Sequence, residues 1–172
     1  MSNHEQCDHL TSVLATDSPA LLNYLQRRVG IQDSPDLLAE VMITAWRRIA
    51  VLPKDPEQAR MWLFGIARNV LADHSRGERR RWRLADRIRS RTSAADATTA
   101  AADTHYEVQD AVSRLPADLA ELVRLVHWDG FTLADAAELT GVSASTARSR
   151  YQRARAQLRV ALFPEEARQT IP

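Results

Sequence analysis

Apolar residues recur at helical spacing through most of the chain, and proline and glycine punctuate the runs. Ser18-Pro19 and Ser34-Pro35 each have the pattern of a helix N-cap followed by a proline in the first turn. Gly30 is placed where the first of these helices should end, and Asp55-Pro56 repeats the capping pattern. The first half of the chain is therefore predicted to hold three helices, which follow a flexible N-terminal tail at residues 1–17.

The second and third predicted helices are amphipathic. The apolar side of the second, residues 35–49, consists of Leu37, Leu38, Val41, Met42, Ala45 and Trp46. The apolar side of the third consists of Trp62, Leu63, Ile66, Ala67, Val70 and Leu71. The third helix continues into residues 76–91, where eight arginines face only two acids. A stretch with so much charge is predicted to stay outside any core.

Residues 133–162 combine a short helix, a glycine turn and a longer helix. Small residues in the short helix let two helices cross closely before Gly141, which favours a left-handed turn. The longer helix, residues 143–162, has five arginines and no acid. Its predicted apolar stripe consists of Ala147, Tyr151, Ala154 and Leu158. With Ser143 as its N-cap, this arrangement is typical of a helix-turn-helix that reads DNA.

Residues 92–104 are rich in Ala, Thr, Ser and Asp and lack aromatic or large aliphatic side chains. This composition predicts a flexible linker. Strand signals are scarce, so the predicted fold class is all-α. Two small helical domains, residues 18–91 and 105–163, are joined by the linker, and the second contains the helix-turn-helix. Residues 164–172 are predicted to form a C-terminal tail.

Charge and composition narrow the classes of function. The net charge is only +1 over 172 residues, but the 23 basic residues, of which only Lys54 is a lysine, are unevenly spread. Such patches indicate a polyanionic partner. A single cysteine, Cys7, excludes an internal disulfide and fits a reducing cytoplasm. Without a signal-peptide pattern or a long apolar run, the chain is predicted to be cytoplasmic and not inserted in a membrane.

No group of residues predicts catalysis, a cofactor or a metal ion. His4, Cys7 and His9 cluster in a polar terminus, but they lack a fourth ligand and rigid spacing. Asp73-His74-Ser75 contains the residue types of a nucleophilic triad, yet neighbours on one helix face different directions. The expectation is a protein that is not an enzyme.

Three segments taken together resemble one family. Residues 36–46 (DLLAEVMITAW), 61–69 (MWLFGIARN) and 146–155 (TARSRYQRAR) are similar to segments of extracytoplasmic-function (ECF) sigma factors. The resemblance extends over residues 19–162. It implies a dissociable subunit that recruits bacterial RNA polymerase core to promoters, reads the minus-ten and minus-thirty-five elements and assists promoter melting. The polymerase itself would perform the chemistry.

The resemblance also implies roles for individual residues. The clamp helices of the polymerase would contact Asp36, Glu40 and Arg47. The minus-ten element, with one base flipped from the stack, would be held by Lys54, Arg68, Asn69, Asp73, Arg76 and Arg80. The minus-thirty-five element would lie against Thr146, Arg148, Ser149, Gln152 and Arg153. We predict that Asn69 contacts the base, because its amide both donates and accepts, and that Arg155 and Arg159 contact phosphates or the polymerase flap.

Two other functions stay open from the residues alone. A free-standing helix-turn-helix regulator would bind duplex operators without polymerase. A sigma mimic would occupy polymerase without starting RNA. An anti-sigma factor is a further partner that the resemblance suggests.

Overall fold

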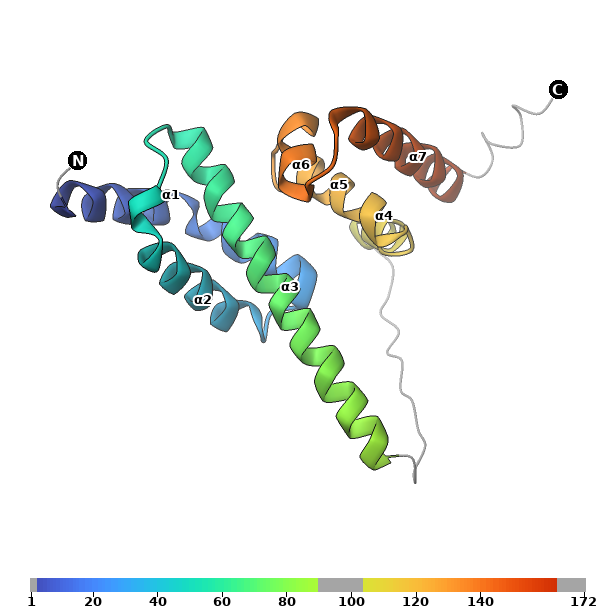
Figure 1. Cartoon of the computed structure of the whole chain (residues 1–172). Helices are drawn as coiled ribbons and strands as arrows, with labels where there is room; N and C mark the ends of the chain where they lie inside the picture. The colour runs from blue at the N-terminus through green and yellow to red at the C-terminus, as the bar shows by residue number, and fades with distance from the viewer. Residues whose placement is uncertain (1–2, 90–103, 164–172) are drawn as a thin grey trace. The chain divides into compact units, whose positions relative to one another are not determined.

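The computed structural model describes residues 3–89 and 104–163, with side chains for residues 4–81 and 107–163. These residues form seven α-helices and one 3₁₀ turn, and the described ranges contain no strand. The chain divides into two units, Met1–Ala95 and Asp96–Pro172 (Figure 1). The predicted all-α class with two helical units is confirmed. The predicted linker at 92–104, apart from Thr104, and the tail at 164–172 lie outside the described residues.

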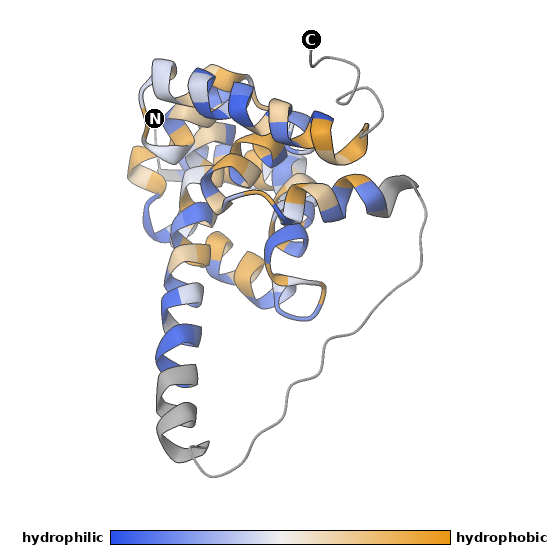
Figure 2. Ribbon diagram, turned by 90° about the vertical axis from the view of Figure 1, so that its right-hand side faces the viewer, coloured by the Kyte–Doolittle hydropathy of each residue, from blue (hydrophilic) through white to orange (hydrophobic). Residues whose placement is uncertain are grey.

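The first unit is a bundle of three helices, α1 (Asn3–Val29), α2 (Ser34–Arg47) and α3 (Pro56–Arg89). A 3₁₀ turn, η1 (Ile49–Val51), lies in the connection between α2 and α3. Each helix packs against the other two. In the core, the rings of Tyr24 and Phe64 form a T-shaped pair with centroids 5.2 Å apart. Helix α3 runs on past α1 and α2 (Figure 1), and the coloured part of this extension is mainly hydrophilic (Figure 2).

The predicted start of the first helix at Ser18 is wrong, because α1 begins at Asn3 and Pro19 lies inside it. Leu10, Val13 and Leu14 are buried, so the apolar side of the helix extends into the predicted tail. Burying three aliphatic side chains, at about 1.5 to 3 kcal/mol each, outweighs the roughly 3 kcal/mol cost of an internal proline. The predicted tail at residues 1–17 is therefore helical from residue 3 onward.

The other helix boundaries of this unit follow the sequence signals more closely. Asp55 caps α3, because its Oδ1 accepts the backbone N–H of Gln58 at 2.9 Å. Gly30 ends α1 with φ of 87°. Ser34, however, is not a cap: it is the first residue of α2, is fully buried, and donates through Oγ to the Ile31 carbonyl at 3.2 Å.

The second unit contains α4 (Thr104–Ser113), α5 (Ala117–His127), α6 (Leu133–Thr140) and α7 (Ala144–Leu162). Helix α7 packs against each of the other three. Its side of the core consists of buried Ala154 and partly buried Tyr151 and Leu158, packed with Leu119 and Val123 of α5. The predicted apolar stripe of the helix-turn-helix is thus confirmed as the buried side of α7.

Candidate nucleic-acid interface

Helix α7 starts from a turn that is held at several points. Gly141 adopts the left-handed conformation with φ of 69°, and Val142 donates its N–H to the Ala137 carbonyl at 3.0 Å. Ser143 then caps α7, because its Oγ accepts the N–H of Thr146 at 3.1 Å. The predicted roles of Gly141 and Ser143 are confirmed. These bonds fix the direction in which α7 leaves the turn.

The outer side of α7 is cationic and rich in hydrogen-bond donors. Ala147 and Ala154 are fully buried, and the small size of alanine lets the helix approach the rest of the unit closely. The opposite side exposes four residues that we call the α7 face, Arg148, Ser149, Gln152 and Arg153. The structure therefore gathers four of the five residues predicted for the minus-thirty-five element, while Thr146 is half-buried beside the N-cap.

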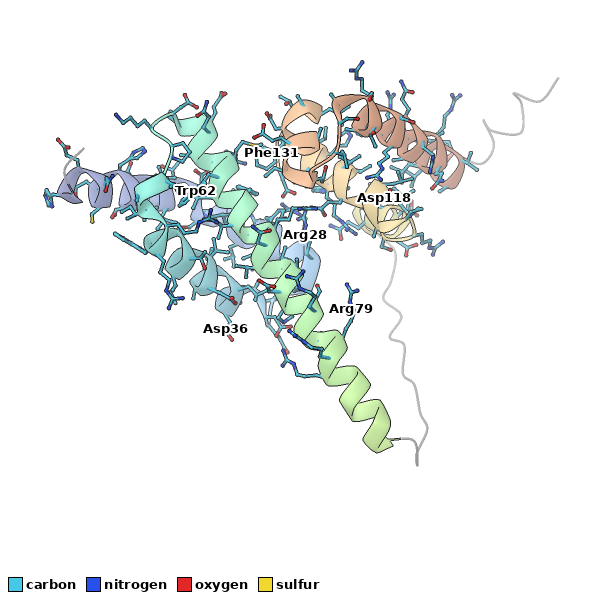
Figure 3. All side chains as sticks on the ribbon, in the orientation of Figure 1. Arg28, Asp36, Trp62, Arg79, Asp118 and Phe131 are labelled. Carbon is cyan, nitrogen blue, oxygen red and sulfur yellow. The ribbon has the colours of Figure 1, made fainter. Side chains whose placement is uncertain are left out.

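Two polar contacts tie α7 to α5 and were missed by the sequence analysis. Arg150 Nε lies 3.2 Å from Asp118 Oδ2 near the start of α5, where Asp118 is labelled in Figure 3. At the end of α5, Nε2 of His127 is 2.7 Å from the Tyr151 hydroxyl, and the two rings stack with centroids 5.9 Å apart. Contacts at both ends of α5 restrict rotation of α7 about its own axis. The sequence offers no signal for them, because the partners are distant along the chain.

Helix α3 presents a second polar surface. Asn69, Asp73, Arg76 and Arg80 follow one another at intervals of four, three and four residues and are all exposed. We call these four residues the α3 stripe. Asp73 Oδ1 and Arg76 Nη2 form an ion pair within it. Arg68 is exposed beside Asn69, whereas Val70 and Leu71 are buried.

The structure does not bring all predicted minus-ten residues together. Lys54 is exposed in the connection before α3, which begins at Pro56. Because an α-helix rises 1.5 Å per residue, Asn69 lies about 20 Å along α3 from that start. The predicted set therefore spans a long surface with Lys54 at one end and Arg80 on the extended part of α3. Arg79, labelled in Figure 3, marks this extended part.

Helix α2 exposes a mixed surface of charged and apolar residues. Asp36, Glu40, Ile43 and Arg47 also follow intervals of four, three and four residues and are exposed; Asp36 is labelled in Figure 3. Ile43 is 51% exposed and the adjoining Trp46 is 42% exposed. These five residues are called the α2 face.

The prediction that Trp46 lies on the buried side of α2 is wrong. Val41 and Ala45 are fully buried and occupy the inward direction. Each residue of an α-helix turns by about 100°, so Trp46 leaves the core at the edge of the helix. Neither Ile43 nor Trp46 was predicted to lie on an exposed surface. The signal available was Ile43 itself, which falls in register with Asp36, Glu40 and Arg47.

Within the described ranges, no three His, Cys, Asp or Glu side chains gather in a way that would hold a metal ion. The two N-terminal histidines considered above have other partners: His4 pairs with Asp8 at 3.4 Å, and Nε2 of His9 lies 2.9 Å from the Pro53 carbonyl. No helix that the structure describes is both long enough and apolar enough to cross a membrane.

Two family models match the chain, one in each unit. The model for sigma-70 region 2 matches residues 14–81, which include α2 and most of α3. The model for sigma-70 region 4 matches residues 105–158, which include α5, α6 and most of α7. Together the two matches extend over more than half of the chain and contain every residue predicted for the clamp helices, the minus-ten element and the minus-thirty-five element. Arg159 lies just beyond the second match.

Individual relatives agree with the family models. The chain is 30% identical over 146 residues to the ECF RNA polymerase sigma factor SigL of Mycobacterium tuberculosis. This alignment covers 83% of this chain and 82% of the relative. It is 31% identical over 161 residues to the ECF sigma factor EcfG of Rhodopseudomonas palustris, covering 93% and 88%. Among solved structures, the sigma factor RpoE of Bartonella quintana, crystallised with the anti-sigma factor NepR, has the same fold. The two structures superpose with a TM-score of 0.70 at 24% sequence identity, over 90% of this chain and 97% of the RpoE chain.

Proposed function

The chain belongs to the ECF sigma factors of the sigma-70 family, and we propose that its two units divide promoter recognition between duplex and opened DNA. As a sigma factor it directs RNA polymerase core to specific promoters for transcription initiation. Sigma factors are not enzymes, and the chemistry of RNA synthesis belongs to the polymerase. The match to region 2 favours this function over a free-standing helix-turn-helix regulator, which would need no such domain.

The α7 face is our candidate reader of the minus-thirty-five element. A helix in the major groove reads base edges through side chains that donate in pairs, and arginine to guanine and glutamine to adenine are the favourable combinations. Arg148, Gln152 and Arg153 provide these groups on one exposed side of a capped helix without acids. The capped start and the contacts with α5 support a fixed presentation of these side chains to the groove. Thr146 and Ser149 supply hydroxyls nearer the helix start.

The α3 stripe, together with Arg68, is our candidate surface for the minus-ten element. Holding an unstacked base requires a polar group that reads its edge and cations that bind the backbone. Asn69 both donates and accepts, and Arg76 and Arg80 supply charge farther along the same side. Asp73 keeps Arg76 in place through their ion pair. Lys54 is proposed to contact the backbone at the other end of this surface.

The α2 face is our candidate polymerase contact. Protein interfaces typically have an apolar centre and a polar rim, with most of the binding energy in the centre. Ile43 and Trp46 supply exposed apolar surface, and Asp36, Glu40 and Arg47 supply charges around it. We propose that the clamp helices of the polymerase cover this face, and that Arg155 and Arg159 of α7 lie toward the flap.

Regulation by an anti-sigma factor is a further part of the proposal. The Bartonella RpoE protein was solved bound to such a factor. A protein that covers the α2 face of this chain would compete with polymerase directly. The proposed place of action is the cytoplasm, where polymerase and promoter DNA are found.

The observation that carries the proposal is the presence of region 2 and region 4, each with an exposed polar surface built on a long helix. The test is run-off transcription with sigma-free core polymerase, this protein and fragmented genomic DNA from its source, followed by sequencing of RNA 5′ ends. The proposal expects discrete starts that share two spaced upstream motifs. Binding to core without any start would favour the sigma mimic, and absence of core binding would favour the free-standing regulator.

A further inference from the structure

We propose that His9 is a positioning residue for promoter recognition, because it holds the connection that carries Lys54. The inference rests on the proposed contact of Lys54 with minus-ten DNA. It concerns the first part of α1, which precedes the region 2 match at residues 14–81. Nothing in that match assigns a role to residues 3–13.

The first part of α1 is built into the bundle. Leu10 is fully buried and Val13 is 8% exposed. Helix α1 contacts η1, the 3₁₀ turn between α2 and α3, and Leu52 directly after η1 is buried as well. Apolar contact therefore brings the start of α1 against the connection. His9, next to Leu10, is half-buried at this junction.

One hydrogen bond joins His9 to the connection. Its Nε2 lies 2.9 Å from the carbonyl oxygen of Pro53, 44 residues away along the chain. A carbonyl can only accept, so Nε2 must carry the proton and donate. The Pro53 carbonyl and the backbone nitrogen of Lys54 belong to the same planar peptide group. The imidazole thereby fixes the peptide plane from which Lys54 projects.

The connection has limited backbone support of its own at this point. Val51 and Leu52 donate to Arg48 and Ile49, at 3.0 and 3.1 Å, and close the 3₁₀ turn. Pro53 and Pro56 have no N–H to donate. The next capping bond joins Gln58 to Asp55 at the start of α3. The bond from His9 thus falls between two locally stabilised turns, beside the single lysine of the chain.

Loss of this bond should allow the connection to sample other conformations without unfolding the bundle. The net stabilisation by one hydrogen bond corresponds to a change of roughly 2- to 12-fold in the population of the conformation in which the connection is bonded to His9. Minus-ten recognition should weaken by a similar factor, because Lys54 would reach its contact less often. Recognition of the minus-thirty-five element by α7 should not change.

The experiment compares His9→Ala with His9→Gln in the full chain bound to core polymerase. Glutamine carries an N–H donor at a position similar to histidine Nε2, so it should restore what alanine loses. His4→Ala is the matched control, since His4 is exposed on the same helix and pairs with Asp8. One readout is hydrogen exchange of residues 48–55 in the free protein. The other is transcription from a template library randomised in the minus-ten and minus-thirty-five elements.

The expected result for His9→Ala alone is faster exchange at residues 48–55 and a several-fold loss of minus-ten recognition, without a change in base preference, because a backbone contact carries no sequence information. Unchanged exchange, or minus-ten use equal to that of the unmodified protein, would overturn the inference. Lys54→Ala, tested in parallel, separates the positioning role of His9 from the proposed DNA contact of Lys54. If Lys54→Ala alters minus-ten use and His9→Ala does not, the inference about His9 fails alone; if neither does, the proposed contact of Lys54 fails with it.

Discussion

Helices α7 and α3 both expose arginines, but they hold them in different ways. Helix α7 packs against its unit along its length, through buried Ala147 and Ala154 and partly buried Leu158. Polar contacts fix the turn that precedes α7 and restrict the rotation of the helix about its axis. Helix α3 is buried over its first half and then extends past its neighbours, as Figure 1 shows. The α7 face contains no acid, whereas the α3 stripe contains Asp73 paired with Arg76.

Under the proposed assignment, this difference corresponds to two recognition tasks. Reading a duplex through the major groove requires a rigid helix, because base edges are identified by the placement of donors and acceptors. Binding an opened DNA strand requires a polar group that contacts a base and cations that follow the flexible DNA backbone. We therefore propose that the packing of α7 determines specificity in the second unit. In the first unit, specificity would depend on which residues make up the α3 stripe.

The largest effect is expected where α7 is packed. Ala154→Glu would place an uncompensated charge at a fully buried position, at a cost of about 3 to 5 kcal/mol in the free energy of unfolding. Hydrogen exchange should show loss of protection in α7, with α1 to α3 unaffected. Ala156→Glu, at an exposed position of the same helix, is the control and should change stability by no more than about 0.5 kcal/mol. Equal effects of the two variants would contradict the packing described for α7.

A smaller effect is expected at the α7 face. Arg153→Ala should weaken binding to native promoters by about 1 to 3 kcal/mol and relax base preference at minus thirty-five. Binding to polymerase core should be retained. Arg114→Ala removes the same charge from the same unit, where Arg114 pairs with Asp110 on α4, and serves as control. Unchanged transcription from all native promoters would refute the role of Arg153.

Removal of the Asn69 amide should act on strand opening. Asn69→Ala loses at least one hydrogen bond to the proposed flipped base, with a cost of about 1 kcal/mol. Permanganate reactivity of thymines in the minus-ten region should fall more than affinity for core polymerase. Gln32→Ala removes an exposed amide from the same unit and should leave opening unchanged. Normal permanganate footprints with Asn69→Ala would contradict this assignment.

The smallest effect is expected at the end of the α3 stripe. Arg80→Ala should weaken binding similarly for all sequences and reduce the slope of log affinity against log salt by about 1. The measurement is a salt titration of promoter binding by the complete polymerase complex. A change in base preference, rather than in salt dependence, would show that Arg80 reads bases.

Much of this fold follows from local signals, and the exceptions have physical causes. Ser143, Gly141 and Asp55 behave as predicted because caps and left-handed turns are determined by adjacent residues. The helix start predicted at Ser18-Pro19 is wrong because the burial of Leu10 and Val13, a tertiary effect, extends α1 past this local start signal.

The candidate site was predicted unevenly for the same reason. The α7 face follows from helical periodicity alone, and it holds four of the five residues predicted for the minus-thirty-five element. The orientation of that face also depends on contacts such as His127 with Tyr151, which join residues far apart in the sequence. Trp46 was assigned to the core because it is apolar, whereas Ala45 occupies the inward direction.

The division of tasks between the two helices can be measured directly with two DNA probes. The complete polymerase complex would be tested against a duplex with only the minus-thirty-five element and a single strand with only the minus-ten element. We expect a crossed pattern: Arg153→Ala lowers affinity only for the duplex, and Asn69→Ala lowers affinity only for the single strand. Equal losses on both probes, or losses with the probes exchanged, would contradict it.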